Sequence, residues 1–170
     1  MEFKKNLVLL GMMGSGKSTI GKLIAKKLNA KFIDIDKVIE KETGMTITKI
    51  FLEKGETFFR NLEEKTSLNL LNSHDNIISL GGGGFINNEI KKKVLSNSLS
   101  FWLSCNTYTL LNRIKKSKKR PLVFNLDDNE IIHLITKRSK IYSKAHFKIR
   151  CNKLSKNEIV KKIIKLYEAN

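Results

Sequence analysis

The chain of 170 residues has few cysteines, only one proline and no long hydrophobic run. Its two cysteines, Cys105 and Cys151, are too few for a disulfide framework and form no CxxC pair, so a reducing cytoplasm is the expected location. The longest apolar stretch, residues 7–13, is much shorter than the roughly 18 residues of a membrane span. It runs into Gly14 without a small-residue cleavage site, which argues against a signal peptide. The sequence therefore predicts one globular domain over residues 1–170 and no membrane partner.

Acidic residues are also scarce, with 16 Asp and Glu against 33 Lys and Arg, for a net charge of +17. This charge makes nucleic acid the first partner to consider. The basic residues are mostly lysines spread over nearly every predicted helix, which favours a solvated surface and predicts no nucleic-acid partner. A basic nucleic-acid-binding protein stays the alternative from another class. The few arginines mark positions where a planar, bidentate cation is needed. They are Arg60, Arg113, Arg120, Arg138 and Arg150.

Apolar runs of strand length alternate along the chain with stretches of helical period. Strands are predicted at 6–10, 31–35, 76–80, 99–104 and 147–151. Helices are predicted at 18–28, 56–72, 87–96, 106–116, 128–143 and 156–168. Such alternation is typical of an α/β fold with a mostly parallel sheet covered by helices on both faces.

Two segments interrupt this alternation. Residues 37–62 are predicted to form two or three short helices broken at Gly44 and Gly55, which is more chain than one crossover needs. We interpret them as an acceptor-binding insert. Residues 115–127 begin with a basic run, contain the single proline, Pro121, and lack an amphipathic period. They are predicted to form a mobile loop.

The strongest motif is GMMGSGKS at residues 11–18, which satisfies GxxxxGK[ST] between a predicted strand and a predicted helix. Glycines let successive amide groups point into one concavity, and the helix N-terminus adds its positive dipole end. Lys17 can then reach the β and γ phosphates, and the Ser18 hydroxyl can ligate Mg²⁺. The motif predicts an ATP site. Its residues are Gly14, Ser15, Gly16, Lys17, Ser18 and Thr19.

Two further groups follow predicted strands at the edge where ligands of α/β sheets bind. Asp34 and Asp36 would point the same way on an extended chain, one holding water on Mg²⁺ and the other accepting a hydrogen bond from an attacking hydroxyl. The alternative is that they only begin a helix at residue 37. The glycines at 81–84 suit close approach of the backbone to a small molecule, with a flexible turn as the alternative. No NKxD sequence is present, which disfavours a GTPase.

The chain resembles shikimate kinase over essentially its whole length. The likeness lies in GMMGSGKS, DID at 34–36, FRNLE at 59–63, SLGGG at 79–83, RPL at 120–122, and KR at 137–138 followed by Tyr142. The resemblance implies a P-loop NTPase fold of the nucleoside-monophosphate-kinase type, with a five-stranded parallel sheet. It also implies transfer of the ATP γ-phosphoryl group to the 3-hydroxyl of shikimate, by a monomeric enzyme.

On the nucleotide side, the resemblance implies that Lys17 and Ser18 serve ATP and Mg²⁺ and that Asp34 belongs to the outer sphere of the metal. Arg113 matches the residue that lies against the adenine. Arg120 matches the catalytic arginine of a lid over residues 115–127, which folds over the phosphates.

On the acceptor side, Asp36 matches the residue that binds the reacting hydroxyl. Arg60 and Arg138 match the residues that hold the substrate carboxylate, and Gly81, Gly82 and Gly83 match the glycines beside the ring. Glu63, three residues after Arg60 on a predicted helix, would orient that guanidinium, with an unremarkable surface pair as the alternative.

Two departures from the family pattern stand out. Gly84 occupies a position where the family usually has alanine or another small residue. Residues 152–155 lack the Arg and Pro often found near the adenine. The runner-up function is another small-molecule kinase of the same fold, such as a gluconate or nucleoside-monophosphate kinase.

Overall fold

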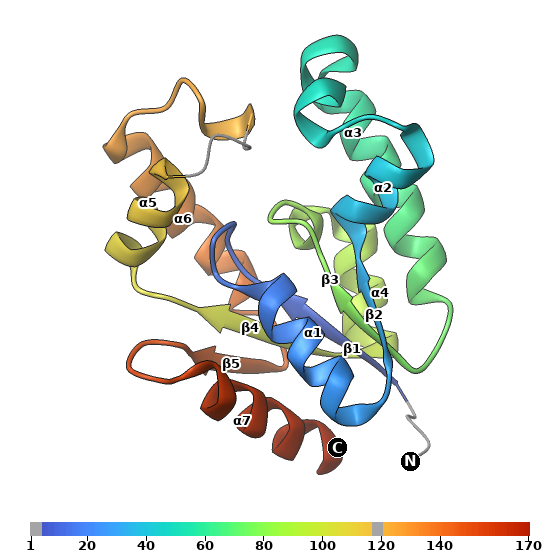
Figure 1. The fold of residues 1–170 in the computed structure, drawn as a ribbon. Coiled ribbons are helices and arrows are strands. Elements are labelled where there is room, and N and C mark those ends of the chain that lie inside the picture. The colour runs from blue at the N-terminus through green and yellow to red at the C-terminus, as the bar shows by residue number, and fades with distance from the viewer. Residues whose placement is uncertain (1–4, 117–120) are drawn as a thin grey trace.

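A computed structural model describes residues 5–116 and 121–170. Five parallel strands form one sheet in the order β2-β3-β1-β4-β5 (Figure 1). The strands are β1 (Asn6–Leu10), β2 (Lys31–Asp34), β3 (Asn76–Ser79), β4 (Ser98–Ser104) and β5 (Phe147–Arg150). The predicted parallel sheet is therefore confirmed, and each predicted strand lies within one residue of an observed one.

Seven α-helices and two short 3-10 helices are found in the described residues. The α-helices are α1 (Lys17–Leu28), α2 (Ile35–Thr43), α3 (Ile47–Leu71), α4 (Asn88–Asn97), α5 (Thr107–Lys115), α6 (Asp128–Tyr142) and α7 (Lys156–Glu168). The 3-10 helices are η1 (Gly84–Ile86) and η2 (Pro121–Val123). Asp127 and Ser155 begin α6 and α7 with reciprocal capping boxes, which satisfy amides that the first turn leaves without partners. No helix of this described part is long and apolar enough to cross a membrane.

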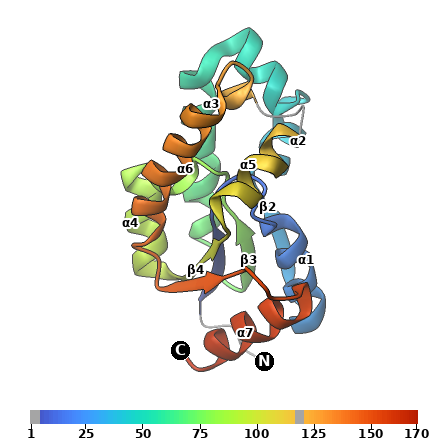
Figure 2. The same cartoon turned by 90° about the vertical axis from the view of Figure 1, so that its left-hand side faces the viewer.

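The side chains of each central strand alternate between two hydrophobic cores. Leu7 and Leu9 of β1 pack with buried residues of α1 and α7 on one face. Val8 and Leu10 pack on the other face with buried residues of α3, α4, α5 and α6. Figure 2 shows α7 and α1 on one side of the sheet and α4 and α6 on the other. Helices on both faces leave the carboxyl ends of the strands as the edge open to ligands.

The predicted insert at 37–62 is formed by α2 and the first half of α3. Gly44 ends α2 in the left-handed conformation, with φ of 65°. Gly55 interrupts the 25-residue α3 with φ of 82° and ψ of 169°. Both predicted breaks are thus found, because glycine adopts positive φ without the clash that a Cβ atom causes. The helix predicted at 56–72 is the part of α3 that follows this kink, and one of the short helices predicted for the insert is the part that precedes it, from Ile47.

The predicted loop at 115–127 is described only in part. The helix α5 ends at Lys115, and residues 121–123 form η2, so the described portion includes one helical turn that the sequence did not predict. Val123 is buried and joins the core on this face of the sheet, and η2 contacts α3. Arg120, the predicted lid arginine, lies outside the described residues.

Candidate active site

The turn between β1 and α1 is built for an anion. Gly11, Gly14 and Gly16 have φ of 141°, 81° and 94°, values that L side chains rarely adopt. The Ser15 amide donates to the Met12 carbonyl at 3.1 Å and closes the turn, while Gly16 caps α1 from the left-handed region. This conformation directs backbone amides toward one point ahead of the helix N-terminus, where phosphate is bound favourably.

Lys17 and Ser18 lie at the start of α1 and reach groups outside it. The Lys17 ammonium donates to the carbonyls of Gly11 at 2.7 Å and Met12 at 3.2 Å, so it folds over the same turn. The Ser18 hydroxyl donates to Asp34 Oδ2 at 2.5 Å and joins α1 to the end of β2. The Lys17 ammonium, the Ser18 hydroxyl and the Asp34 carboxylate are therefore gathered around the phosphate-binding turn. The motif predicts this position for Lys17 and Ser18.

Asp34 and Asp36 meet in the site for a reason that the sequence argument had wrong. Asp34 is the last residue of β2, but Asp36 is in the first turn of α2, so the two do not share an extended chain. The alternative expected a helix to begin here, and one does, although α2 begins at residue 35 and not 37. Asp34 is in the N-cap position, but its side chain bonds to Ser18 and makes no capping bond within this described segment.

The Asp36 carboxyl group is held in an unfavourable electrostatic environment. Its Oδ1 atom is inaccessible to solvent and has no hydrogen-bond partner in the part of the chain that the structure describes. Burial, together with the negative charges of Glu63 and Asp34, raises the pKa of Asp36 to about 6, against the opposing positive charge of Lys17. A carboxyl group of this kind is a stronger base than an exposed aspartate and has a lone pair ready for a donor.

Arg60 and Glu63, one turn apart on α3, form a largely shielded ion pair. Arg60 Nη1 donates to Glu63 Oε2 at 2.5 Å, and Arg60 Nη2 donates to Glu56 Oε1 at 3.0 Å. Glu63 is only 2% exposed, so the alternative of an unremarkable surface pair is wrong. Glu63 and Glu56 fix the guanidinium from two sides, which orients its remaining donors.

Arg138 and Tyr142 approach the glycine turn from α6. The Arg138 side chain is buried, and its Nη1 donates to the Gly82 carbonyl at 3.2 Å. The Tyr142 hydroxyl donates to the same carbonyl. Arg138 Nε, by contrast, has no partner among the described residues, and burial lowers the pKa of the guanidinium. Buried donors of this kind are normally satisfied, which points to an anionic ligand.

Of the four glycines after β3, Gly81 and Gly83 are needed for space, and none is needed for an unusual backbone angle. At all four described positions φ lies outside the left-handed region. A Cβ atom on Gly83 would lie 2.3 Å from Arg60 Nη1, and one on Gly81 would lie 2.4 Å from Glu63 Oε1. The sequence predicted that the backbone of these glycines lies close to a small molecule. In the structure, Gly83 and Gly81 lie close to the side chains of Arg60 and Glu63. Gly84 is different, because its nearest neighbour, Glu63 Oε1, would be 3.4 Å away.

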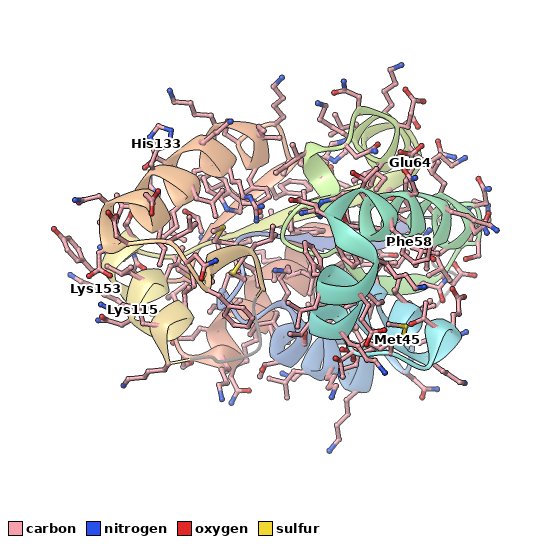
Figure 3. All side chains as sticks on the ribbon, turned by 90° about the horizontal axis from the view of Figure 1, so that it is seen from above. Met45, Phe58, Glu64, Lys115, His133 and Lys153 are labelled. Atoms are coloured by element: carbon pink, nitrogen blue, oxygen red, sulfur yellow. The ribbon has the colours of Figure 1, made fainter. Side chains whose placement is uncertain are left out.

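These groups line a cleft of about 380 Å³, the first cleft, at the carboxyl edge of the sheet. Figure 1 shows α2 and α3 rising on one side of this edge and α5 and α6 on the other. Seen from above in Figure 3, Met45 and Phe58 lie on the α2 and α3 side, and Lys115 and Lys153 lie on the α5 side. The predicted site residues in its lining are Gly14, Gly16, Lys17, Ser18, Thr19, Asp34, Asp36, Arg60, Gly82, Gly83 and Arg138.

Ser15 and Arg113 instead line a second cleft of about 850 Å³, on the other side of the same turn. Arg113 is exposed, and its Nη1 donates to the Gly14 carbonyl at 3.0 Å. Asn152 Oδ1 accepts from the Asn106 amide at 2.9 Å and joins the loop after β5 to the start of α5. Gly14, Gly16 and Thr19 line both clefts, so one elongated ligand can pass from one to the other.

Sequence reasoning missed the apolar wall of the first cleft. Phe51 and Phe59 line the first cleft on either side of the Gly55 kink, with their rings 4.8 Å apart. Phe59 is part of the FRNLE motif, but the sequence assigns neither ring a role. Tyr142 is part of the resemblance without a role of its own, and its spacing of four residues from Arg138 places both on one helix face.

Comparison with known proteins agrees with this geometry. The family model described as shikimate kinase matches residues 13–168. A shikimate kinase of Persephonella marina is 42% identical over 160 residues, covering 94% of this chain and 97% of that protein. One of Thermodesulfovibrio yellowstonii is 39% identical over 165 residues, covering 96% and 95%.

Solved structures give the same result. Shikimate kinase from Acinetobacter baumannii in complex with shikimate has a TM-score of 0.91 and 29% identity, with 98% of this chain and 94% of that one covered. A deoxyadenosine kinase from M. mycoides, with a TM-score of 0.66 and 17% identity, shares the P-loop kinase fold alone. The chain belongs to the shikimate kinase family.

Proposed function

We propose that this chain transfers the γ-phosphoryl group of ATP to the 3-hydroxyl of shikimate, giving shikimate 3-phosphate and ADP in chorismate biosynthesis. One observation carries the proposal: the phosphate-binding turn, Asp36 and two arginines, Arg60 and Arg138, all line the same cleft. Shikimate is a cyclic carboxylate with a reactive hydroxyl, so its two ends match these two kinds of group. Family membership supports the same assignment.

The residues around the turn fit ATP with Mg²⁺. The amides of the turn and Lys17 would bind the phosphates, and the Ser18 hydroxyl would hold the metal, with Asp34 acting through water. Their oxygens already share a hydrogen bond at the edge of the cleft. No three His, Cys, Asp or Glu side chains of residues 5–116 and 121–170 form a metal-binding cluster. That suits Mg²⁺, which keeps several waters and binds one or two protein groups plus phosphates. When bound, it neutralises charge on the phosphates.

Positioning accounts for most of the mechanism. The arginines would hold the shikimate carboxylate, since Arg138 Nε has no partner in the described chain and Arg60 is oriented by Glu63. Gly81, Gly82 and Gly83 would lie beside the ring, whose apolar face would rest on Phe51 and Phe59. The Asp36 carboxylate, which lines the first cleft, would accept the hydrogen bond of the reacting hydroxyl and orient it toward the γ phosphate. Little covalent chemistry is asked of the protein.

Other parts of the proposal concern the second cleft and closure over the substrates. Arg113 would lie against the adenine, because the nucleotide leaves the shared turn on that side. The insert at 37–62 and the lid at 115–127, with Arg120, would close over both substrates and exclude water. We further propose a monomer in the cytoplasm, without nucleic acid or membrane as a partner.

Release of ADP, measured with and without shikimate, tests the function. We expect release to depend on shikimate, and Lys17→Ala to lower it at least about 100-fold because a preorganised cation at the phosphates is lost. Equal release without an acceptor would refute the kinase assignment. Release with gluconate or a nucleoside monophosphate, but not with shikimate, would support the runner-up. Salt-sensitive retention on DNA or RNA would instead favour the nucleic-acid-binding class.

Replacement of Gly83 should impair acceptor binding without unfolding the protein. A Cβ atom there would lie against the end of the Arg60 side chain, which would have to move away from Glu63. We expect Gly83→Ala to raise KM for shikimate about ten-fold, because the guanidinium leaves its place. We expect the free energy of unfolding to fall by about 1–3 kcal/mol, because the buried Glu63 carboxylate loses its partner.

Gly84→Ala is the matched control, since its Cβ atom would make only a 3.4 Å contact. Steady-state kinetics and thermal melts of the two variants provide the comparison. Equal shikimate KM values for both variants would show that Arg60 does not bind the acceptor.

A further inference from the structure

The two cysteines of the chain lie side by side at the ends of neighbouring strands. Ser104 of β4 pairs with Arg150 of β5 in parallel register, and Cys105 and Cys151 directly follow these residues. The Cys151 amide donates to the Ser104 carbonyl at 2.9 Å, so the pairing continues to the cysteines. Neighbouring strands are about 4.8 Å apart. This spacing is within the range of Cα separations that a disulfide bond requires.

Both thiols face the second cleft next to the phosphate-binding turn. Each is free and partly exposed, and each lines this cleft together with Ser15 and Arg113. Cys105 Sγ lies 3.7 Å from the Ser15 carbonyl oxygen. A group attached to Cys105 would therefore occupy space beside the turn.

The surroundings make Cys105 the more reactive of the two. The hydrogen bond with the Cys151 thiol, together with the positive charges of Arg113 and Lys17, lowers the pKa of Cys105 to about 7, against the opposing effect of burial. The same hydrogen bond raises the pKa of Cys151. Cys105 also directly precedes the N-cap of α5, and a helix N-terminus favours a thiolate. At neutral pH a large fraction of Cys105 is thus thiolate, beside a protonated Cys151.

We propose that Cys105 and Cys151 form a thiol modification site on the nucleotide side of the phosphate-binding turn, which reacts with small-molecule disulfides. The Cys105 thiolate attacks one sulfur of the disulfide, whose S–S bond breaks, and one thiolate leaves. Cys151 gives its proton to that leaving thiolate and attacks the Cys105 sulfur, which expels the second thiolate. The balance is two cysteine thiols oxidised to one disulfide and one small disulfide reduced to two thiols.

Modification and nucleotide binding should exclude each other. The mixed disulfide would fill the second cleft, where the proposed function places the adenine. This consequence rests on the proposed function, whereas the thiol chemistry does not. Shikimate, in the first cleft, should have no such effect.

Intact-mass measurement with oxidised glutathione as the probe tests the site. The wild type should lose two hydrogens and keep no glutathione. Cys151→Ser should stop at the mixed disulfide, because no resolving thiol is left. Cys105→Ser should react roughly five-fold more slowly at pH 7, from the smaller thiolate fraction offset by its higher nucleophilicity. Equal rates for the two variants, or a wild type that never forms the internal disulfide, would overturn the proposal.

A pH profile of Cys105 alkylation distinguishes its chemical environment from simple exposure. Serine at position 151 can still donate a hydrogen bond, whereas alanine cannot. Alkylation should therefore reach half its maximal rate at a lower pH in Cys151→Ser than in Cys151→Ala. Coincident profiles would refute the role of the 151 side chain.

Protection by ATP separates the two proposals. We expect saturating ATP to slow glutathionylation of Cys151→Ser at least about ten-fold, with shikimate as the control ligand that has no effect. Unchanged modification in the presence of ATP would refute the overlap with the nucleotide. The kinase assignment would still be judged separately, by shikimate-dependent ADP release from the reduced protein.

Discussion

Asp36→Asn is expected to lower kcat about 100-fold or more while the dissociation constant of ATP changes only a few-fold. The amide keeps the shape of the side chain but loses the negative charge that accepts and orients the reacting hydroxyl. Asp36 lies in α2 and not in the phosphate-binding turn, so the groups that bind ATP stay in place. Initial rates of ADP release and a direct ATP titration provide the two measurements.

The same substitution should stabilise the fold at pH 8. Because folding raises the pKa of Asp36 from 3.8 to about 6, the charged form disfavours the folded state. Two pKa units correspond to about 3 kcal/mol, an upper value for the gain in Asp36→Asn. The advantage is fully present above the folded pKa. It shrinks as pH falls from 6 toward 4, where the wild-type carboxyl group is neutral in both states.

Urea denaturation at pH 8 and pH 5 measures this difference. Glu53→Gln is a suitable control, since it removes one carboxylate from an exposed ion pair with Lys49. It should leave both kcat and the unfolding free energy nearly unchanged. An Asp36→Asn variant with wild-type kcat, or with lower stability at pH 8, would contradict the assigned role.

Arg138→Lys is expected to raise KM for shikimate about 10- to 100-fold, equivalent to losing one charged hydrogen bond of 1.5–3 kcal/mol. Lysine offers a point charge in place of a planar fork, whereas Arg138 lines the first cleft with a buried Nε that has no partner among the described residues. KM for ATP should stay within a few-fold of the wild type, because Arg138 bonds to the Gly82 carbonyl and not to a residue of the phosphate-binding turn.

Arg150→Lys is the matched control for this exchange. Arg150 is exposed at the end of β5 and lines neither cleft. The same chemical change there should alter neither KM. If both variants bind shikimate like the wild type, Arg138 does not hold the carboxylate.

Local sequence determined much of the fold and of the phosphate site. The glycines and Lys17 of the first turn predicted an anion-binding loop, because positive φ and an amide concavity are properties of a few consecutive residues. The strands were found within one residue, since each is a short apolar run between turn residues. Gly44 and Gly55 predicted the breaks in the insert for the same local reason.

The fold alone decided which residues meet. Asp34 and Asp36 were placed on one strand, yet Asp36 enters the cleft from a helix. Glu63 was a possible surface residue until the packing of α3 against the glycine turn buried it.

Residues far apart in the sequence form the rest of the site. Tyr142 and Arg138 reach Gly82 across about a third of the chain, and Cys105 meets Cys151 only because β4 and β5 are neighbours. Backbone conformation depends on nearby residues, and a sequence shows it. The burial of a side chain, its pKa and the atoms that it contacts depend on segments far away in the sequence. These properties are set only when the sheet order β2-β3-β1-β4-β5 brings those segments together.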